Sequence, residues 1–290
     1  MNPPLPRRRR PARRGMYILP SLFTAGSIGA GFYAIVQSLQ GTPVDPQHFD
    51  YAALAIGFAI PFDGLDGRVA RMTNTASEFG RELDSLADVI TFGVAPAILA
   101  YSWGFRMLPL SMDPVLRHKL LQIGAVISFL FLICGACRLA RFNTSADAKP
   151  KNPGRPDRKY FVGMPIPAAA GIIAATVHFF EGAPVFNGVA VWLWVAIIGL
   201  TGFLMVSTWR FWSGKEITLT GRHPFQVLVL IGAVVCVVIL FHQYVLVVLA
   251  FGYMFSGLLA RAAYSWQMRH RHRPAAAVEP HSESSHPGEL

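Results

Sequence analysis

Four aspartates stand close together in the stretch FDGLDGRVARMTNTASEFGRELDSLADVITFG, between two apolar runs. Asp63 and Asp66 are three residues apart, and Asp84 and Asp88 are four apart, so on helices each pair shares one face. Two facing helices would bring four carboxylates together, where their charges repel strongly. A divalent cation removes this repulsion, and all-oxygen ligands suit Mg²⁺ or Mn²⁺. The spacing therefore predicts a metal site made of these four side chains.

The residues between the aspartates suit a ligand that carries phosphate. Gly64, Gly67 and Gly80 have no side chain, so a bulky ligand can approach the backbone, and Arg71 supplies a guanidinium that matches phosphate. Metal ions beside an arginine indicate phosphoryl-type chemistry, in which charge stabilisation is the main catalytic effect. A spare carboxylate can serve as the base. The plainer alternative is four independent aspartates that cap helices or pair with nearby arginines.

The composition is that of a membrane protein. The 290-residue chain is 53% hydrophobic and only 14% charged, whereas soluble domains carry about a quarter charged residues. Its apolar residues occur in runs of about 20, the length that crosses a bilayer core. We therefore expect an all-α integral membrane protein with about eight transmembrane helices, at 16–40, 50–72, 79–103, 118–142, 164–182, 187–207, 224–241 and 243–266.

The charges indicate an orientation in the membrane. The net charge is +10, and the basic residues lie in tails and loops, which favours anionic lipid headgroups over nucleic acid as the partner. With the N-terminus in the cytoplasm, all but three of the 26 Lys and Arg residues fall on the cytoplasmic side. The exceptions are Arg106, Arg117 and Lys119. We therefore expect the aspartates and both termini to face the cytoplasm.

The chain divides simply. We expect a disordered basic arm at 1–15, one transmembrane catalytic domain at 16–266 and a disordered tail at 267–290. Cys134 and Cys137 form a CxxC motif, but it lies inside an apolar run, and Cys236 is isolated. These cysteines are therefore interpreted as packing residues rather than as a redox or metal site.

The aspartate stretch resembles the signature of a known family. Its eight fixed residues, from Asp63 to Asp88, resemble the motif of the CDP-alcohol phosphatidyltransferase family without gaps. The resemblance implies a helical membrane bundle that acts on a CDP-linked donor. It makes Asp63, Asp66 and Asp84 metal ligands, and Asp88 the general base that also reaches the metal. It places the CDP part of the donor against Gly67, Arg71, Ser77, Ser21 and Thr24.

Three further segments resemble the bacterial, membrane-embedded phosphatidylserine synthases within that family. They are DSLADVITFGVAPA at 84–97, CRLARFN at 137–143 and FVGMPIPAAAG at 161–171. This resemblance implies CDP-diacylglycerol and L-serine as substrates, the inner membrane of a bacterium as the location, and a homodimer as an assembly. Ser21 and Ser27 stand where these synthases usually have asparagine. Alternatives are another acceptor, glycerol 3-phosphate or an inositol phosphate, and, more remotely, a divalent-cation transporter.

Two arginines are candidates for the serine carboxylate. Arg138 and Arg141 are three residues apart, and bidentate arginine fits a carboxylate. The alternative is that both snorkel to lipid phosphates or mark the end of the helix. Asn143 either contacts the substrate or caps the helix. Pro165 and Pro167 disfavour a continuous helix start and are expected to shape a loop over the site.

Overall fold

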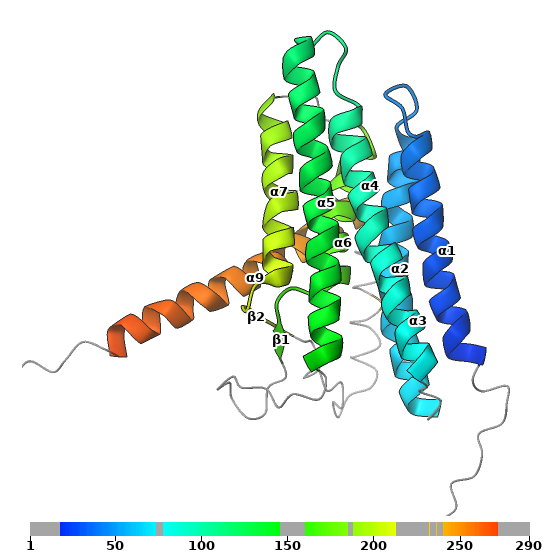
Figure 1. Cartoon of the computed structure of the whole chain (residues 1–290), viewed down its shortest axis with the longest axis vertical. Coiled ribbons are helices and arrows are strands. Elements are labelled where there is room, and N and C mark those ends of the chain that lie inside the picture. Colours follow the sequence, from blue (N-terminus) through cyan, green and yellow to red (C-terminus); the bar gives the residue numbers. More distant parts are fainter. Residues whose placement is uncertain are drawn as a thin grey trace, which may run out of the picture.

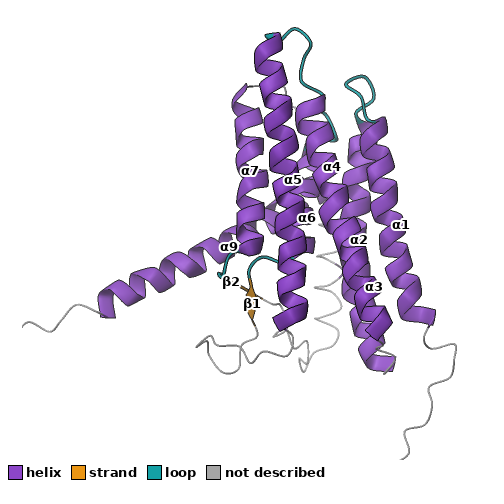
Figure 2. Ribbon diagram, viewed as in Figure 1, coloured by secondary structure: helices purple, strands orange, loops and turns teal. Residues whose placement is uncertain are grey.

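The computed structural model describes residues 18–73, 78–145, 160–184, 188–212, 232, 236 and 240–271. Helices dominate the described chain and form a bundle with a small sheet at one end (Figures 1 and 2). The elements are α1 (Ile18–Gln40), α2 (Gln47–Thr73), α3 (Glu78–Asp88), η2 (Val89–Val94), α4 (Ala95–Tyr101), η3 (Ser102–Arg106), α5 (Pro114–Ser145), β1 (Tyr160–Val162), α6 (Ile166–Phe179), α7 (Gly188–Val206), β2 (Arg210–Trp212) and α9 (His242–Arg271).

Within the residues that the structure describes, five helical segments are long and apolar enough to cross a bilayer, which confirms an all-α membrane protein. They are Leu22–Gln40, Glu78–Arg106, Pro114–Thr144, Gly188–Val206 and His242–Trp266. Helix α2 does not meet these criteria, and α6 has only 14 residues. Seven of the eight predicted segments contain a described helix, while 224–241 lies almost wholly outside the described residues. The count of eight spans is therefore not confirmed.

The last helix runs past the predicted end of the transmembrane domain. Helix α9 continues to Arg271, so residues 267–271, which the prediction assigns to the tail, are helical. In Figure 1, α9 runs obliquely out of the bundle. The predicted arm at 1–15 and the remaining tail, 272–290, lie outside the described residues.

The third predicted helix contains two π-helical turns, which are wider than α-helical ones. The segment Glu78–Arg106 is continuous, but η2 and η3 within it are π-helical. The first π-turn begins directly after Asp88, and such turns often occur at functional sites. Thr91 of η2 is fully buried, and its hydroxyl donates a 2.9 Å hydrogen bond to the Ser27 carbonyl of α1. Helix α1 therefore packs tightly against the turn that follows Asp88.

Gly31 makes this close packing of α1 and η2 feasible. A Cβ at position 31 would lie 2.8 Å from the Thr91 Cα atom, which is main chain and cannot swing away. We predict that Gly31→Leu lowers the free energy of unfolding by about 1–3 kcal/mol, as overpacking does elsewhere. Thermal unfolding in detergent measures this effect. Gly29→Leu is the matched control, because a Cβ at Gly29 meets nothing within 4 Å. Equal melting of the two variants would contradict the prediction.

A two-stranded sheet, which the sequence analysis does not predict, lies near the lower end of the bundle in Figure 2. Strands β1 and β2 are antiparallel, with Phe161 opposite Phe211. The Gly163 amide donates to the Trp209 carbonyl just beyond the strands, and the Met164 amide donates to the Leu204 carbonyl in the last turn of α7. Phe211 is fully buried and contacts Gly257 of α9. The sheet therefore joins the end of α7 to α9.

The two prolines of the GMPIP segment do not form a loop. Pro165 immediately precedes α6, and Pro167 lies in its first turn. The first amides of a helix have no intrahelical acceptor, so proline costs nothing there. The Ala169 amide donates to the Pro165 carbonyl and closes this first turn. Both prolines start α6, and the prediction that they shape a loop is wrong.

Polar contacts hold the opposite end of the bundle together. Arg106 Nη2 donates to the carbonyls of Leu39 and Gly41 at the end of α1, at 2.9 and 2.8 Å. Arg117 Nε donates to the Leu108 carbonyl. Arg106 and Arg117, two of the three basic residues that the charge pattern places on the side opposite the cytoplasm, therefore bind main-chain carbonyls.

His178 of α6 bridges the Asp50 carboxylate of α2 and the His242 ring of α9, which ties these three helices together.

Candidate active site

Three of the four predicted metal ligands converge. Asp63 comes from α2, and Asp84 and Asp88 come from α3. One carboxylate oxygen of each lies within 4.8 Å of the others, and all three side chains are half-buried. The i, i+4 spacing of Asp84 and Asp88 places them on one face, as the sequence predicts. Asp66 follows one turn after Asp63 on α2, but its side chain lies outside the described ones.

The cluster fits a divalent cation. The carboxyls of Asp63 and Asp88 are hydrogen-bonded to each other, and Asp84 adds its charge nearby. Asp88 Oδ1 is buried and has no hydrogen-bond partner among the described residues. A buried carboxylate oxygen without a partner is costly, and a cation at this point would satisfy it. The donor set, three carboxylates, suits an oxygen-seeking ion such as Mg²⁺ or Mn²⁺.

A buried arginine lies next to the cluster. Arg138 of α5 is only 8% exposed and interacts electrostatically with Asp63 and Asp88. Its guanidinium lies 5.7 Å from the centre of the Phe142 ring, and Tyr253 of α9 is also close to it. Because buried charges are paired or functional, this guanidinium is a strong candidate to meet an anionic ligand beside the metal site.

The other two predicted serine contacts lie differently. The Arg141 guanidinium donates to four main-chain carbonyls, those of Val162, Met205, Val206 and Ser207. Asn143 Nδ2 donates a 3.0 Å hydrogen bond to Ser85 Oγ, next to Asp84 on α3. The two arginines share one helix face, as predicted, but they have different partners. Arg138 interacts electrostatically with the carboxylates, whereas Arg141 binds main-chain carbonyls of β1 and of the end of α7.

The predicted nucleotide contacts are placed only in part. Thr24 is buried on α1, at 5% exposure. Ser21 lies on α1 and Gly67 and Arg71 lie on α2, but the surroundings of these three residues are not among those described, and Ser77 lies outside the described residues. Tyr253 is a neighbour of the site that the sequence analysis missed. No spacing signal links it to the aspartates, because it lies 165 residues beyond Asp88.

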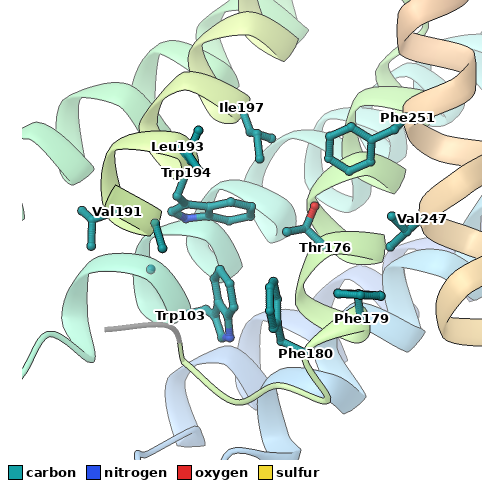
Figure 3. Close-up of a pocket in the computed structure, with 12 residues that line it drawn as sticks. Trp103, Thr176, Phe179, Phe180, Val191, Leu193, Trp194, Ile197, Val247 and Phe251 are labelled. Atoms are coloured by element: carbon teal, nitrogen blue, oxygen red, sulfur yellow. The ribbon is translucent and has the colours of Figure 1, made fainter. Parts of the chain in front are cut away.

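A separate cavity of about 270 Å³ lies between η3, α6, α7 and α9 (Figure 3). Its polar wall atoms are already used: the Trp103 and Trp194 indoles donate to main-chain carbonyls, and the Thr176 hydroxyl donates to Ile172. Trp103 follows Asp88 by 15 residues, or roughly 20 Å at helical rise. The cavity is therefore apolar, remote from the carboxylates, and unsuited to a phosphate.

Comparisons with known proteins agree with this site. A CDP-alcohol phosphatidyltransferase family model matches residues 17–193. The chain is 39% identical over 208 residues to the CDP-diacylglycerol–serine O-phosphatidyltransferase of Helicobacter pylori 26695, covering 70% of this chain and 75% of that enzyme. It is 34% identical over 196 residues to the Bacillus subtilis 168 enzyme of the same name, covering 68% of this chain and 90% of the relative. The Saccharomyces cerevisiae enzyme of that name is 37% identical over 161 residues, 55% of this chain and 53% of the relative.

The match covers α1 to the first residues of α7, and so it includes all three converging aspartates and Arg138. Three helices thus bring together carboxylates and a guanidinium in a chain that also resembles the two bacterial enzymes over two thirds of its length. The chain belongs to the CDP-alcohol phosphatidyltransferase family.

Proposed function

We propose that this protein transfers the phosphatidyl group from CDP-diacylglycerol to L-serine, giving phosphatidylserine and CMP. The observation that carries the proposal is the convergence of Asp63, Asp84 and Asp88 beside the buried Arg138. The names of the similar enzymes supply the donor and the acceptor. A cation-assisted pyrophosphate site next to a guanidinium suits a phosphoryl donor and an acceptor that carries a carboxylate.

The aspartates divide the chemical work. Asp63, Asp66, Asp84 and Asp88 would hold Mg²⁺ or Mn²⁺, which when bound offsets the charge that develops on the pyrophosphate oxygens. Asp88 accepts the proton of the serine hydroxyl. The serine oxygen then bonds to the phosphorus that carries diacylglycerol, the bond from that phosphorus to the CMP oxygen breaks, and CMP leaves with the electron pair.

The remaining predicted residues bind and orient the substrates. We assign the CDP part of the donor to Gly67, Arg71, Ser77, Ser21 and Thr24, as the family resemblance implies. Arg138 faces the serine carboxylate, where a bidentate guanidinium is the favoured partner. Asn143 supports this region through Ser85, beside Asp84. Holding both substrates in line lowers the barrier, because the reaction then becomes effectively unimolecular.

We further propose that the protein lies in the inner membrane of a bacterium, with the aspartates and both termini facing the cytoplasm. The distribution of Lys and Arg supports this orientation. The carbonyl contacts of Arg106 and Arg117 support it too, because they give these cations a structural reason to lie on the opposite side. We also propose a homodimer, which cross-linking in native membranes tests.

CMP release by the purified protein from CDP-diacylglycerol tests the proposed function. We expect release to require serine, and to be at background with glycerol 3-phosphate or inositol phosphate as the only acceptor. CMP release with one of those two acceptors and not with serine would support the proposed phosphatidyl transfer but would show that serine is not the acceptor. Flux of Mg²⁺ or Mn²⁺ into proteoliposomes, without CMP release under any condition, would overturn the enzyme in favour of a transporter.

A further inference from the structure

Arg141 of α5 binds the end of another helix. Its guanidinium donates to the carbonyls of Met205, Val206 and Ser207, where α7 ends, and to the Val162 carbonyl of β1, over distances of 2.8 to 3.3 Å. The last carbonyls of a helix have no intrahelical donor, and a cation there is favourable. Arg141 therefore caps α7 and fastens β1 to it.

The backbone at Gly163 leaves room for this guanidinium. Gly163 has a φ of +78°, a conformation that side chains rarely adopt. A Cβ at this position would meet Arg141 Nη2 and the carbonyls of Met205 and Ser207. The chain after β1 is thus shaped around the arginine, which is a second and independent sign that the contact is built into the fold.

The same sheet reaches the surroundings of Arg138. Tyr253 of α9 donates its hydroxyl to the Trp212 carbonyl of β2, and its ring packs against Phe211. Tyr253 in turn interacts electrostatically with Arg138, which is one helical turn before Arg141 on α5. Arg141 and Tyr253 therefore attach the sheet from two sides, and Arg138 interacts electrostatically with Tyr253 and with the aspartates.

We propose that Arg141 is a positioning residue: through β1–β2 and Tyr253 it holds Arg138 at the aspartates, where Arg138 receives the carboxylate of the serine acceptor. This inference rests on the proposed function. It assigns Arg141 a role other than the direct serine contact that the sequence suggests. Arg141 acts on the acceptor and not on the CDP-linked donor, because the residues assigned to the donor lie on α1 and in 67–77.

Arg141→Lys tests the role with the positive charge kept. An ammonium is a compact point charge and lacks the planar fork that reaches several carbonyls. We expect the KM for serine to rise about tenfold, which corresponds to about 1.4 kcal/mol. The KM for CDP-diacylglycerol should change by less than about twofold, since only the acceptor's binding is affected.

Arg106→Lys is the matched control. Arg106 also donates to carbonyls at a helix end, but at the opposite end of the bundle. We expect it to lower the melting temperature and leave both KM values unchanged. If Arg141→Lys likewise lowers only the melting temperature, or raises both KM values equally, Arg141 is merely structural and the inference is overturned.

Tyr253→Phe provides a milder second variant, because it removes only the hydroxyl that binds Trp212. We expect a rise of about threefold in the serine KM, as loss of one neutral hydrogen bond implies. An unchanged serine KM in this variant would overturn the role of the sheet. Wild-type protein that releases no CMP with serine would refute the proposed function itself, whereas wild-type activity with unaltered variants refutes only the positioning role.

Discussion

Asp88→Asn is expected to lower the rate of serine-dependent CMP release by about 10³-fold or more, because the amide can neither accept the hydroxyl proton nor replace a carboxylate at the cation. Asp88 is the member of the cluster with a buried, unpartnered oxygen, and it lies directly before the π-turn η2. Its position is therefore set by helix packing and not by a mobile loop. The kcat measured at saturating serine and CDP-diacylglycerol reports the loss.

The same variant should fold normally. Asparagine removes one of several mutually repelling carboxylates, so the cation-free protein should not lose stability. Asp113→Asn is the control for the substitution itself. Asp113 caps α5 by accepting the Leu116 amide at 2.8 Å, and asparagine caps helices equally well. We expect full activity in that control. An Asp88→Asn protein whose kcat stays within tenfold of wild type would exclude Asp88 as the base.

The aspartate cluster is predictable from sequence because its spacing is local. Residues four apart on a helix share a face whatever the rest of the fold does, so Asp84 and Asp88 converge as expected. The expectation that a second helix brings further carboxylates to this pair does not follow from local spacing. It rests on the cost of isolated charges at membrane depth, and Asp63 of α2 does lie with Asp84 and Asp88.

The division of roles between Arg138 and Arg141 is not predictable in this way. The spacing of three correctly places both on one side of α5 near its end. Which partner each one meets depends on where α7 ends, some 65 residues later in the chain, and on β1. Every residue has a main-chain carbonyl, so residue types do not reveal where an arginine can bind a helix end. Reasoning from residue types therefore predicts that Arg141 binds the carboxylate of a ligand.

The sheet and the π-turns were also beyond sequence reasoning. Strands of three residues are too short for alternation to be visible, and β1 and β2 are held by pairing and by buried Phe211. The π-turn η2 lies in an apolar run that suits any buried helix, and its tight contact depends on Gly31 of a different helix. Both features arise from packing between distant segments.

Removal of divalent cations is expected to abolish CMP release and, without any substrate present, to lower the melting temperature. A ligand that binds only the folded state at 100 times its dissociation constant stabilises it by about 2.7 kcal/mol. Thermal unfolding in detergent, with chelator and then with added Mg²⁺ or Mn²⁺, measures this effect independently of turnover. The ion that gives the larger shift at equal concentration is the one that the site prefers.

Asp63→Asn separates binding at the cluster from general effects of salt. Because Asp63, Asp84 and Asp88 bring three acidic groups together, loss of one carboxylate relieves repulsion in the cation-free protein. The variant should therefore be at least as stable as wild type in chelator, yet gain little from Mg²⁺ or Mn²⁺. Cations that raise the melting temperature of both proteins equally must bind elsewhere, and the three aspartates would then not be a cation site.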